Sequence, residues 1–205
     1  NKSVFYYLNQ YDFYVAYETL DGVETPMGFY SRELTSWEKN NLSCICVFPC
    51  YQLKRIGTKL IDFSYRLSKY EKQISGPERP LSNFGKLSYL KYWCKNLSWE
   101  LTYGKLNYQT EISLEIISKE TNFRVNDTLM ALDFMEVLYQ KEDKPPYVDF
   151  YMSEFRNRDH YVLLKDPQGN FKLAIDRKRV KKWLLENNIT EGGHSELKES
   201  MFVLY

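Results

Sequence analysis

Apolar and polar positions along the chain follow two different periods. Runs rich in Tyr, Phe and Val, separated by turn residues, predict antiparallel strands. These runs cover residues 3–8, 11–19 and 26–31. Ser43–Phe48 is a mainly apolar run that Pro49 ends, which predicts a central strand covered on both faces. From Gly57 to Tyr70 the apolar residues instead recur at the spacing of one helical face.

The rest of the chain alternates between helices and strands. Ser82 is expected to cap a helix that reaches about Leu101, and Asn126 and Asp127 are expected to cap a later one. Further helices are predicted over residues 113–120, 125–138 and 180–187, strands over 147–151, 161–164, 171–175 and 201–205, and a turn over 166–170. Two helices followed by a helix flanked by strands are similar to a winged helix.

Composition narrows the class of protein. With 205 residues, 43% of them hydrophobic, the chain can bury the core of one domain or of a domain with an appended lobe. A formal net charge of +1 gives no overall attraction to nucleic acid or to a membrane, and no apolar run has membrane length. The cysteines at 44, 46, 50 and 94 suit a reducing compartment and form no Cys-x-x-Cys pair, so no metal site is expected in this chain.

Candidate chemistry gathers between Asn41 and Pro80. An apolar strand runs into a short basic loop that contains Gly57, and an amphipathic helix follows at once. Free N–H groups at the start of a helix favour an anion, so this order predicts a phosphate-binding loop. About twenty residues further on, the prolines of Gly76–Pro80 hold an acidic turn around Glu78. The combination suggests group transfer from a phosphate-bearing cofactor, assisted by a general base.

Five ordered motifs resemble the acetyltransferase core of the MYST family of histone acetyltransferases. They are Asn40–Ile45, Pro49-x-Tyr51-Gln52, Ile61-Asp62-Phe63-Ser64-Tyr65-x-Leu67-Ser68, Pro77-Glu78-x-Pro80-Leu81-Ser82 and Leu87-Ser88-Tyr89-x-x-Tyr92-Trp93. The flanking segments Pro26–Ser31 and Phe123–Asp127 are most similar to family members that act in chromatin silencing. The resemblance covers most of the chain and is weakest after Gln140.

The resemblance implies a mixed α/β fold of two parts. Residues 1–105 would form the acetyl-CoA-binding core of an N-acyltransferase, built on a mixed central sheet. Residues 106–205 would form the winged-helix-like part. The zinc-finger part that precedes this core in the family is not in this chain.

Acetyl-CoA is the implied co-substrate, and its pyrophosphate needs several N–H donors. The loop that would hold it consists of Gln52, Leu53, Lys54, Arg55, Ile56, Gly57 and Thr58. Gly57 keeps the second glycine of the family pattern, whereas Arg55 replaces the first. Arg55 could crowd the pyrophosphate, or Lys54 and Arg55 could supply the positive charge that Leu53 and Thr58 lack. The resemblance also places Ser82 and the backbone of Ile45 and Val47 against the cofactor.

The family's catalytic residues map onto Glu78 and Cys44. A lysine amine has a pKa of about 10.4 and must lose a proton before it attacks a thioester, so Glu78 is the expected general base. Cys44 could act as a nucleophile, shape the pocket, or simply pack as a small apolar residue. Direct transfer in a ternary complex is the favoured route. Lys2 falls where the family carries a self-acetylated lysine.

The implied function is transfer of acetyl from acetyl-CoA to a lysine of a histone tail, with histone H4 in chromatin silencing as the expected substrate. The implied location is the nucleus, and the implied partners are the histone tail and other subunits of a chromatin-modifying complex. No membrane partner is expected. The basic run Arg177–Lys182 fits a solvated amphipathic helix better than a DNA-binding one. A scaffold subunit with a degenerate cofactor loop is the alternative, and Arg55 is the residue that favours it.

Overall fold

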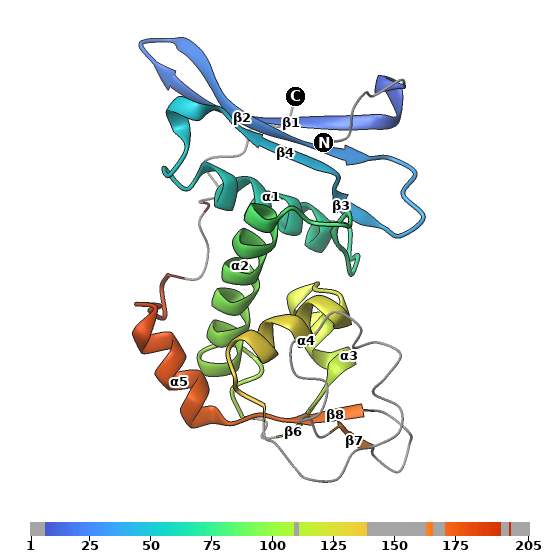
Figure 1. Cartoon of the computed structure of the whole chain (residues 1–205), viewed down its shortest axis with the longest axis vertical. Coiled ribbons are helices and arrows are strands. Elements are labelled where there is room, and N and C mark those ends of the chain that lie inside the picture. Colours follow the sequence, from blue (N-terminus) through green and yellow to red (C-terminus); the bar gives the residue numbers. More distant parts are fainter. Residues whose placement is uncertain (1–6, 109–110, 139–162, 166–170, 194–196, 198–205) are drawn as a thin grey trace. The chain divides into compact units, whose positions relative to one another are not determined.

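The computed structural model describes residues 7–108, 111–138, 163–165, 171–193 and 197 of the chain. Contacts divide the chain into two compact units, Asn1–Ser88 with Ser195–Tyr205 and Tyr89–His194 (Figure 1). The sequence predicted a boundary at residue 105 between two parts of one catalytic domain. The division into compact units does not test that boundary, so it stays a prediction. Several predictions lie outside the described residues: Lys2, the strands at 147–151 and 201–205, most of the strand at 3–8, and the turn at 166–170.

A three-stranded antiparallel sheet forms the first unit's scaffold. Its order is β1 (Tyr11–Leu20), β2 (Val23–Glu33) and β4 (Cys44–Val47). Asp21 and Gly22 join β1 to β2 with φ angles of +50° and +79°, so turn residues separate these two strands, as the sequence pattern indicated. Residues Leu8–Gln10 form a short 3-10 helix, η1, where the end of the first strand was predicted, so that end was wrong.

The prediction of a central, fully covered strand at Ser43–Phe48 was wrong. Within the described residues β4 pairs only with β2, so it is an edge strand. Ile45 and Val47 pack on the core, while Cys46 between them is exposed. The run looked buried because Cys counts as apolar, but only alternate residues of a strand share a face. The parallel pairing lies in a separate two-stranded sheet of β3 (Asn40–Leu42) and β5 (Gly76–Pro77).

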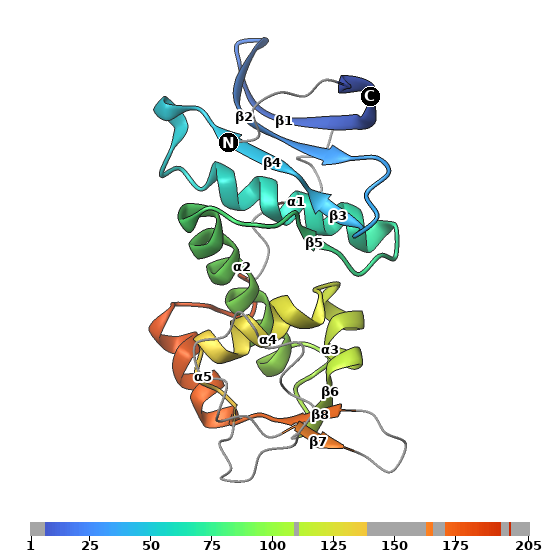
Figure 2. The same cartoon turned by 45° about the vertical axis from the view of Figure 1, so that its right-hand side comes forward.

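Helix α1 (Ile56–Tyr70) lies against the sheet, as Figures 1 and 2 both show, and its bounds match the prediction. Ile56 and Leu60 on its inner face join Tyr30 of β2, which is 0% exposed, in one core cluster. Tyr14 of β1 stacks on Tyr30 with ring centroids 4.8 Å apart. Burial of these large side chains therefore holds α1 against β1 and β2.

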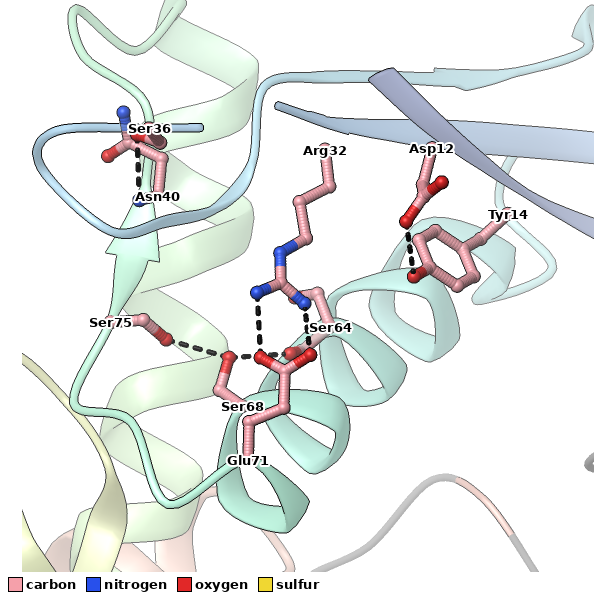
Figure 3. A network of polar contacts seen from close by, with 9 residues as sticks. All are labelled: Asp12, Tyr14, Arg32, Ser36, Asn40, Ser64, Ser68, Glu71 and Ser75. Carbon is pink, nitrogen blue, oxygen red and sulfur yellow. Dashed lines mark hydrogen bonds and ion pairs between the residues drawn. The ribbon is translucent and has the colours of Figure 1, made fainter. Parts of the chain in front are cut away.

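A polar network holds the far end of α1 (Figure 3). Arg32 of β2 donates two hydrogen bonds to the carboxylate of Glu71, at 2.8 and 2.6 Å. These bonds are the main reason that the pKa of Arg32 is raised. Ser75 donates to Ser68 Oγ at 2.7 Å. Since Ser75 immediately precedes β5, the network also fixes where the Glu78 segment begins.

The second unit is mainly helical. It contains most of α2 (Asn83–Thr102), with α3 (Leu114–Thr121), α4 (Val125–Phe134) and α5 (Arg177–Glu186). A three-stranded antiparallel sheet has the order β6 (Glu111–Ser113), β8 (Phe171–Ala174) and β7 (Leu163–Lys165). Helices were predicted at all four places. None of the described helices is long and apolar enough to cross a membrane.

The predicted capping of α4 was wrong. The N-cap residue is Arg124, and it makes no side-chain capping bond within the described residues. Asn126 and Asp127 lie inside the helix, and Asp127 is fully buried. The sequence places two good capping residues together, but tertiary packing draws Asp127 inward instead. Cys94 is a packing residue of α2, where it is buried, and this burial raises the pKa of its thiol.

Candidate active site

Among the described residues, no strand pairs with the outer edge of β4. Phe48 N–H donates to Met27 C=O at 3.0 Å, and along an antiparallel pair every second residue bonds to the partner strand. Because of this alternation, the backbone N–H and C=O groups of Cys46 point toward β2, whereas those of Ile45 and Val47 point away from it. Gln52 Nε2 reaches Val47 C=O at 3.2 Å, which confirms the outward direction of that carbonyl. The edge can therefore pair with an extended, amide-containing ligand.

An irregularity in the strand pairing sets the position of Cys44. Ser31 of β2 is the register partner of Cys44, yet its C=O also accepts a 2.7 Å bond from Ser43 N–H. Two residues thus oppose one, which is the pattern of a β-bulge, and bulges re-aim side chains beside active sites. The Cys44 side chain is half-buried with a free thiol.

The structure brings the Glu78 segment to the strand that leads into Cys44. Glu78 N–H donates to Leu42 C=O at 2.8 Å, directly after the parallel pairing of Leu42 with Pro77. Leu42 is only two residues before Cys44 and is anchored in the core. Glu78 itself is half-buried. The predicted base and the predicted active-site cysteine therefore come from two directly hydrogen-bonded segments.

The predicted cofactor loop joins β4 to α1 through a short 3-10 helix, η2 (Pro49–Tyr51). Two residues of the loop, Leu53 and Arg55, have φ angles of +63° and +61°. Arg55 is the N-cap residue of α1 in the left-handed conformation, which glycine adopts most easily. Arg55 therefore has a backbone conformation that a glycine would adopt without strain, and it adds a side chain there.

The start of α1 offers free hydrogen-bond donors. Lys59 N–H bonds to Arg55 C=O at 3.0 Å, and the N–H groups of the preceding helical residues have no acceptor inside the helix. Arg55 makes no side-chain capping bond within the described residues. Lys54 Nζ lies 5.1 Å from the centroid of the Tyr51 ring, so a cation is held on this loop. Donors and positive charge together suit a phosphate group.

Two glycines lie close to β4, for different reasons. A Cβ on Gly28 of β2 would lie 2.6 Å from Cys46 C=O, so only glycine allows β2 and β4 to pair as they do. A Cβ on Gly57 would meet only Val47 Cγ2, at an ordinary 3.6 Å. The protein itself thus tolerates a side chain at Gly57, and close approach of a ligand would be the reason for glycine there.

Other predicted site residues have more local roles. Ser82 accepts a hydrogen bond from Gly85 N–H at 3.1 Å, which confirms it as a cap of α2 while its hydroxyl proton stays available to a ligand. The side chains of Leu53, Lys54 and Arg55 are exposed at the surface of the loop, whereas Ile56 is buried in the core. Among the described residues, no cluster of three or more His, Cys, Asp or Glu is arranged to hold a metal ion.

The model of the MOZ/SAS family matches residues 1–166. The chain belongs to the MOZ/SAS family. The matched part includes the whole arrangement of β4, the loop before α1 and the Glu78 turn, so these geometries are those of a MOZ/SAS chain. The resemblance to histone acetyltransferases inferred from five motifs is thereby confirmed.

Named relatives of this MOZ/SAS chain are histone acetyltransferases. It is 41% identical to histone acetyltransferase SAS2 of Saccharomyces cerevisiae over 176 residues, which are 81% of this chain and 51% of the relative. It is 32% identical to histone acetyltransferase mst2 of Schizosaccharomyces pombe over 197 residues, 92% of this chain and 47% of the relative. Human histone acetyltransferase KAT6A is 37% identical over 145 residues, 70% of this chain and 7% of the relative. The chain thus spans about half the length of the two yeast proteins.

Sequence reasoning missed three features of the site. Gly28 was noted only within a flanking motif, although a glycine inside a strand pattern signals close backbone approach. Ser31 and Ser43, at the bulge, gave no signal in the sequence. The left-handed conformation of Arg55 was also missed, because a glycine position can mean either free space or positive φ and the sequence does not separate the two.

Proposed function

We propose that the chain is the catalytic part of a histone lysine acetyltransferase that uses acetyl-CoA. One observation carries the proposal: the N–H of Glu78 bonds to the strand that leads into Cys44, next to an open strand edge and an uncapped helix start. A carboxylate, an amide-pairing edge and an anion site are what transfer of an acyl group from a pantetheine thioester requires.

Glu78 acts as the base. The substrate lysine gives one proton to the Glu78 carboxylate, directly or through water, and its nitrogen then attacks the thioester carbon. A carbon–nitrogen bond forms and the carbon–sulfur bond breaks. The CoA sulfur leaves and takes up the second proton that the nitrogen loses, so the products are the amide and the CoA thiol. The half-buried Cys44 shapes the acetyl pocket, and transfer is direct.

The chain's own residues hold acetyl-CoA at two places. The backbone of Ile45 and Val47 pairs with the pantetheine amides along the open edge of β4. The loop Gln52–Thr58 binds the pyrophosphate through its N–H groups, with Lys54 and Arg55 close to the phosphates. Ser82 donates its hydroxyl to the cofactor from the start of α2.

The substrate is a histone tail, with histone H4 in chromatin silencing as the first candidate. The support is the 41% identity to SAS2, a named histone acetyltransferase, over most of the chain. We also propose a nuclear location, self-acetylation of Lys2 and assembly with other subunits of a chromatin-modifying complex.

The part from residue 106 onward is proposed to be winged-helix-like. The helices α3, α4 and α5 and the antiparallel order β6-β8-β7 support this shape. Such a shape does not itself imply binding of nucleic acid. Asp176 caps the basic helix α5 through Lys178 N–H and Arg179 N–H, which supports a structural role for that helix.

Glu78→Gln tests the proposal, because it removes the proton acceptor and keeps the shape. Acetylation of a histone H4 tail peptide at neutral pH should fall by roughly a hundredfold or more. Binding of acetyl-CoA, measured by calorimetric titration, should stay within about twofold. Glu18→Gln, at an exposed position of β1, is the matched control and should leave both unchanged. Turnover by Glu78→Gln at the control rate would remove Glu78 from the mechanism.

Cys44→Ala separates the two routes of transfer. If transfer is direct, this variant keeps substantial turnover when acetyl-CoA is saturating. Mass spectrometry of the unaltered protein mixed with acetyl-CoA alone gives the opposing result: a chemically competent acetyl-Cys44 species would establish the two-step route.

The alternative function, a non-catalytic scaffold, predicts no binding of acetyl-CoA. It was suggested by Arg55 at a glycine position. The left-handed backbone of Arg55 favours the enzyme instead, because a glycine at this position could adopt the same conformation without strain. Calorimetric titration of the chain with acetyl-CoA, with its partner subunits present, separates the two functions, since the scaffold gives no heat of binding.

A further inference from the structure

Three polar side chains around Cys44 are buried without a hydrogen-bond partner in the described part of the chain. Ser31 is 0% exposed and Asn41 1% exposed, and the Ser43 hydroxyl is also buried. For Asn41, both the amide nitrogen and the amide oxygen have no partner there. Buried polar groups in proteins are almost always hydrogen-bonded, so three such side chains within one short region require an explanation.

The backbones of these three residues lie in one local region. Ser43 N–H donates to Ser31 C=O at 2.7 Å, so the two serines are neighbours across the β2–β4 pair. Asn41 is two residues before Ser43. Asn40 pairs with Gly76 and Leu42 pairs with Pro77, so Asn41 is an extra residue on β3 opposite no residue of β5. Both backbone irregularities that lead into Cys44 thus carry a polar side chain that has no hydrogen-bond partner among the described residues.

The arrangement also lies next to the anchor of Glu78. Asn41 and Ser43 flank Leu42, whose C=O accepts the 2.8 Å bond from Glu78 N–H. A change in the conformation of this segment would therefore move the Glu78 backbone and Cys44 together.

The chemistry of the three side chains selects a small neutral ligand. Two hydroxyls and one primary amide offer both donors and acceptors and carry no charge. They do not supply the carboxylates or imidazoles that hold a metal cation, nor a positive charge for an anion. A buried water typically makes about three hydrogen bonds to groups that would otherwise be unsatisfied.

We propose that Ser31, Asn41 and Ser43 hold an internal water molecule that fixes the segment from Asn41 to Cys44, and that Asn41 is thereby a positioning residue for Glu78. The second clause rests on the proposed function, whereas the water site itself does not. The water joins the two irregular pairings, so the positions of Glu78 and Cys44 relative to each other depend on it.

A crystal structure of the chain at about 1.5 Å resolution tests the water site directly. The expected result is one ordered water within hydrogen-bonding distance of Asn41 and at least one of the two serines. Direct bonds from these side chains to protein groups, with no water between them, would overturn the proposal. This outcome does not depend on any acetyltransferase activity, so it is independent of whether the proposed function holds.

Kinetics test the positioning role. Asn41→Leu keeps a similar volume and removes both hydrogen-bonding groups. We expect kcat to fall at least tenfold, the KM for acetyl-CoA to change less than twofold, and the acidic limb of the pH–rate profile to move, because the surroundings of Glu78 change. A kcat within twofold of the unaltered protein, or an unchanged pH profile, would contradict the role.

A matched pair covers the case in which Asn41→Leu does not fold. Ser43→Val and Ser43→Thr have the same shape, and only threonine keeps the hydroxyl. Ser43→Thr should recover most of the kcat that Ser43→Val loses. Equal rates for the two variants would show that the hydroxyl holds nothing and would overturn the proposal.

Discussion

Two helices of this chain, α5 and α1, begin beside basic residues. They differ in whether a side chain accepts hydrogen bonds from their first N–H groups. At α5 the carboxylate of Asp176 accepts bonds from Lys178 N–H at 2.9 Å and Arg179 N–H at 3.2 Å. At α1 the N-cap residue is Arg55, with no side-chain capping bond in the described residues. The protein therefore supplies its own anion at α5, whereas in the described residues the N-cap side chain of α1 supplies none.

The difference shows that basic residues near a helix start do not by themselves mark an anion site. Arg177, Lys178 and Arg179 make α5 the more basic of the two starts. Yet the Asp176 carboxylate already accepts hydrogen bonds from N–H groups at the start of α5. Arg177 donates to the backbone C=O of Leu101 and Leu106. Free donors at α1, rather than the count of charges, distinguish the proposed phosphate loop.

The largest effect is expected when the cap of α5 is transplanted to α1. Arg55→Asp removes a cation and places a carboxylate at the N-cap, where it competes with a phosphate. We expect binding of acetyl-CoA to weaken by more than about a hundredfold, with a melting temperature that does not fall. Arg55→Asn is the neutral control and should lose less. Calorimetric titration at one salt concentration measures both, and equal losses would mean that charge at this position is irrelevant.

Arg55→Ala and Arg55→Gly separate the charge of Arg55 from its backbone conformation. Both remove the guanidinium, whose loss as a phosphate contact should weaken acetyl-CoA binding by roughly ten- to a hundredfold. Only glycine adopts φ near +60° without strain, so Arg55→Gly should also raise stability by about 1 kcal/mol. Tighter binding by Arg55→Gly than by the unaltered protein would show that the arginine obstructs the site and would favour the scaffold.

If the start of α1 is a ligand site, substituting alanine for Gly57 and for Gly28 should change the stability of the protein in opposite directions. Gly57→Ala should stabilise the helix by about 0.5–1 kcal/mol and weaken acetyl-CoA binding by roughly tenfold, since its Cβ meets only Val47 at 3.6 Å within the protein. Gly28→Ala should destabilise the fold by about 1–3 kcal/mol, because its Cβ would clash with Cys46 C=O. Thermal melts and titrations check both. The idea fails if Gly57→Ala binds acetyl-CoA as tightly as the unaltered chain.

The smallest effect on the ligand is expected at α5. Asp176→Ala removes a cap that accepts two N–H bonds, which typically costs about 1 kcal/mol and lowers the melting temperature by roughly 2–4 °C. Acetyl-CoA binding should not change. Asp176→Asn should retain most of the stability because asparagine also caps helices. A loss of acetyl-CoA affinity in Asp176→Ala would mean that the two helix starts are not independent.

The sequence predicted the helices of this comparison more accurately than their ends. The apolar spacing from Gly57 to Tyr70 gave α1 within one residue, because that spacing reports burial of one face. The start of α5 was placed three residues late, at Val180, since the basic residues before it carry no apolar signal. Capping at Asp176 was visible in retrospect, as an aspartate directly before a helical segment is a common start signal.

Strand position was the main failure, and its cause is general. An apolar run such as Ile45–Phe48 records which residues avoid water, not whether a strand has neighbours on both sides. The edge position of β4 depends on pairing with β2, a partner distant in the sequence, and on the break in pairing at Ser43. The site residues were found through family motifs, whereas the relation of Glu78 to Leu42 needed the structure.

The open edge of β4 also affects how the protein behaves in solution. Unpaired N–H and C=O groups on a strand edge can template another chain, and natural proteins limit this hazard with short edges and bulges. Here the edge strand has four residues and a bulge at its start, but Cys46 on it is exposed and can form intermolecular disulfides. Concentrated protein should therefore self-associate more slowly with acetyl-CoA and a reductant present, since in the proposed mode of binding the ligand covers the same groups that another molecule would pair with.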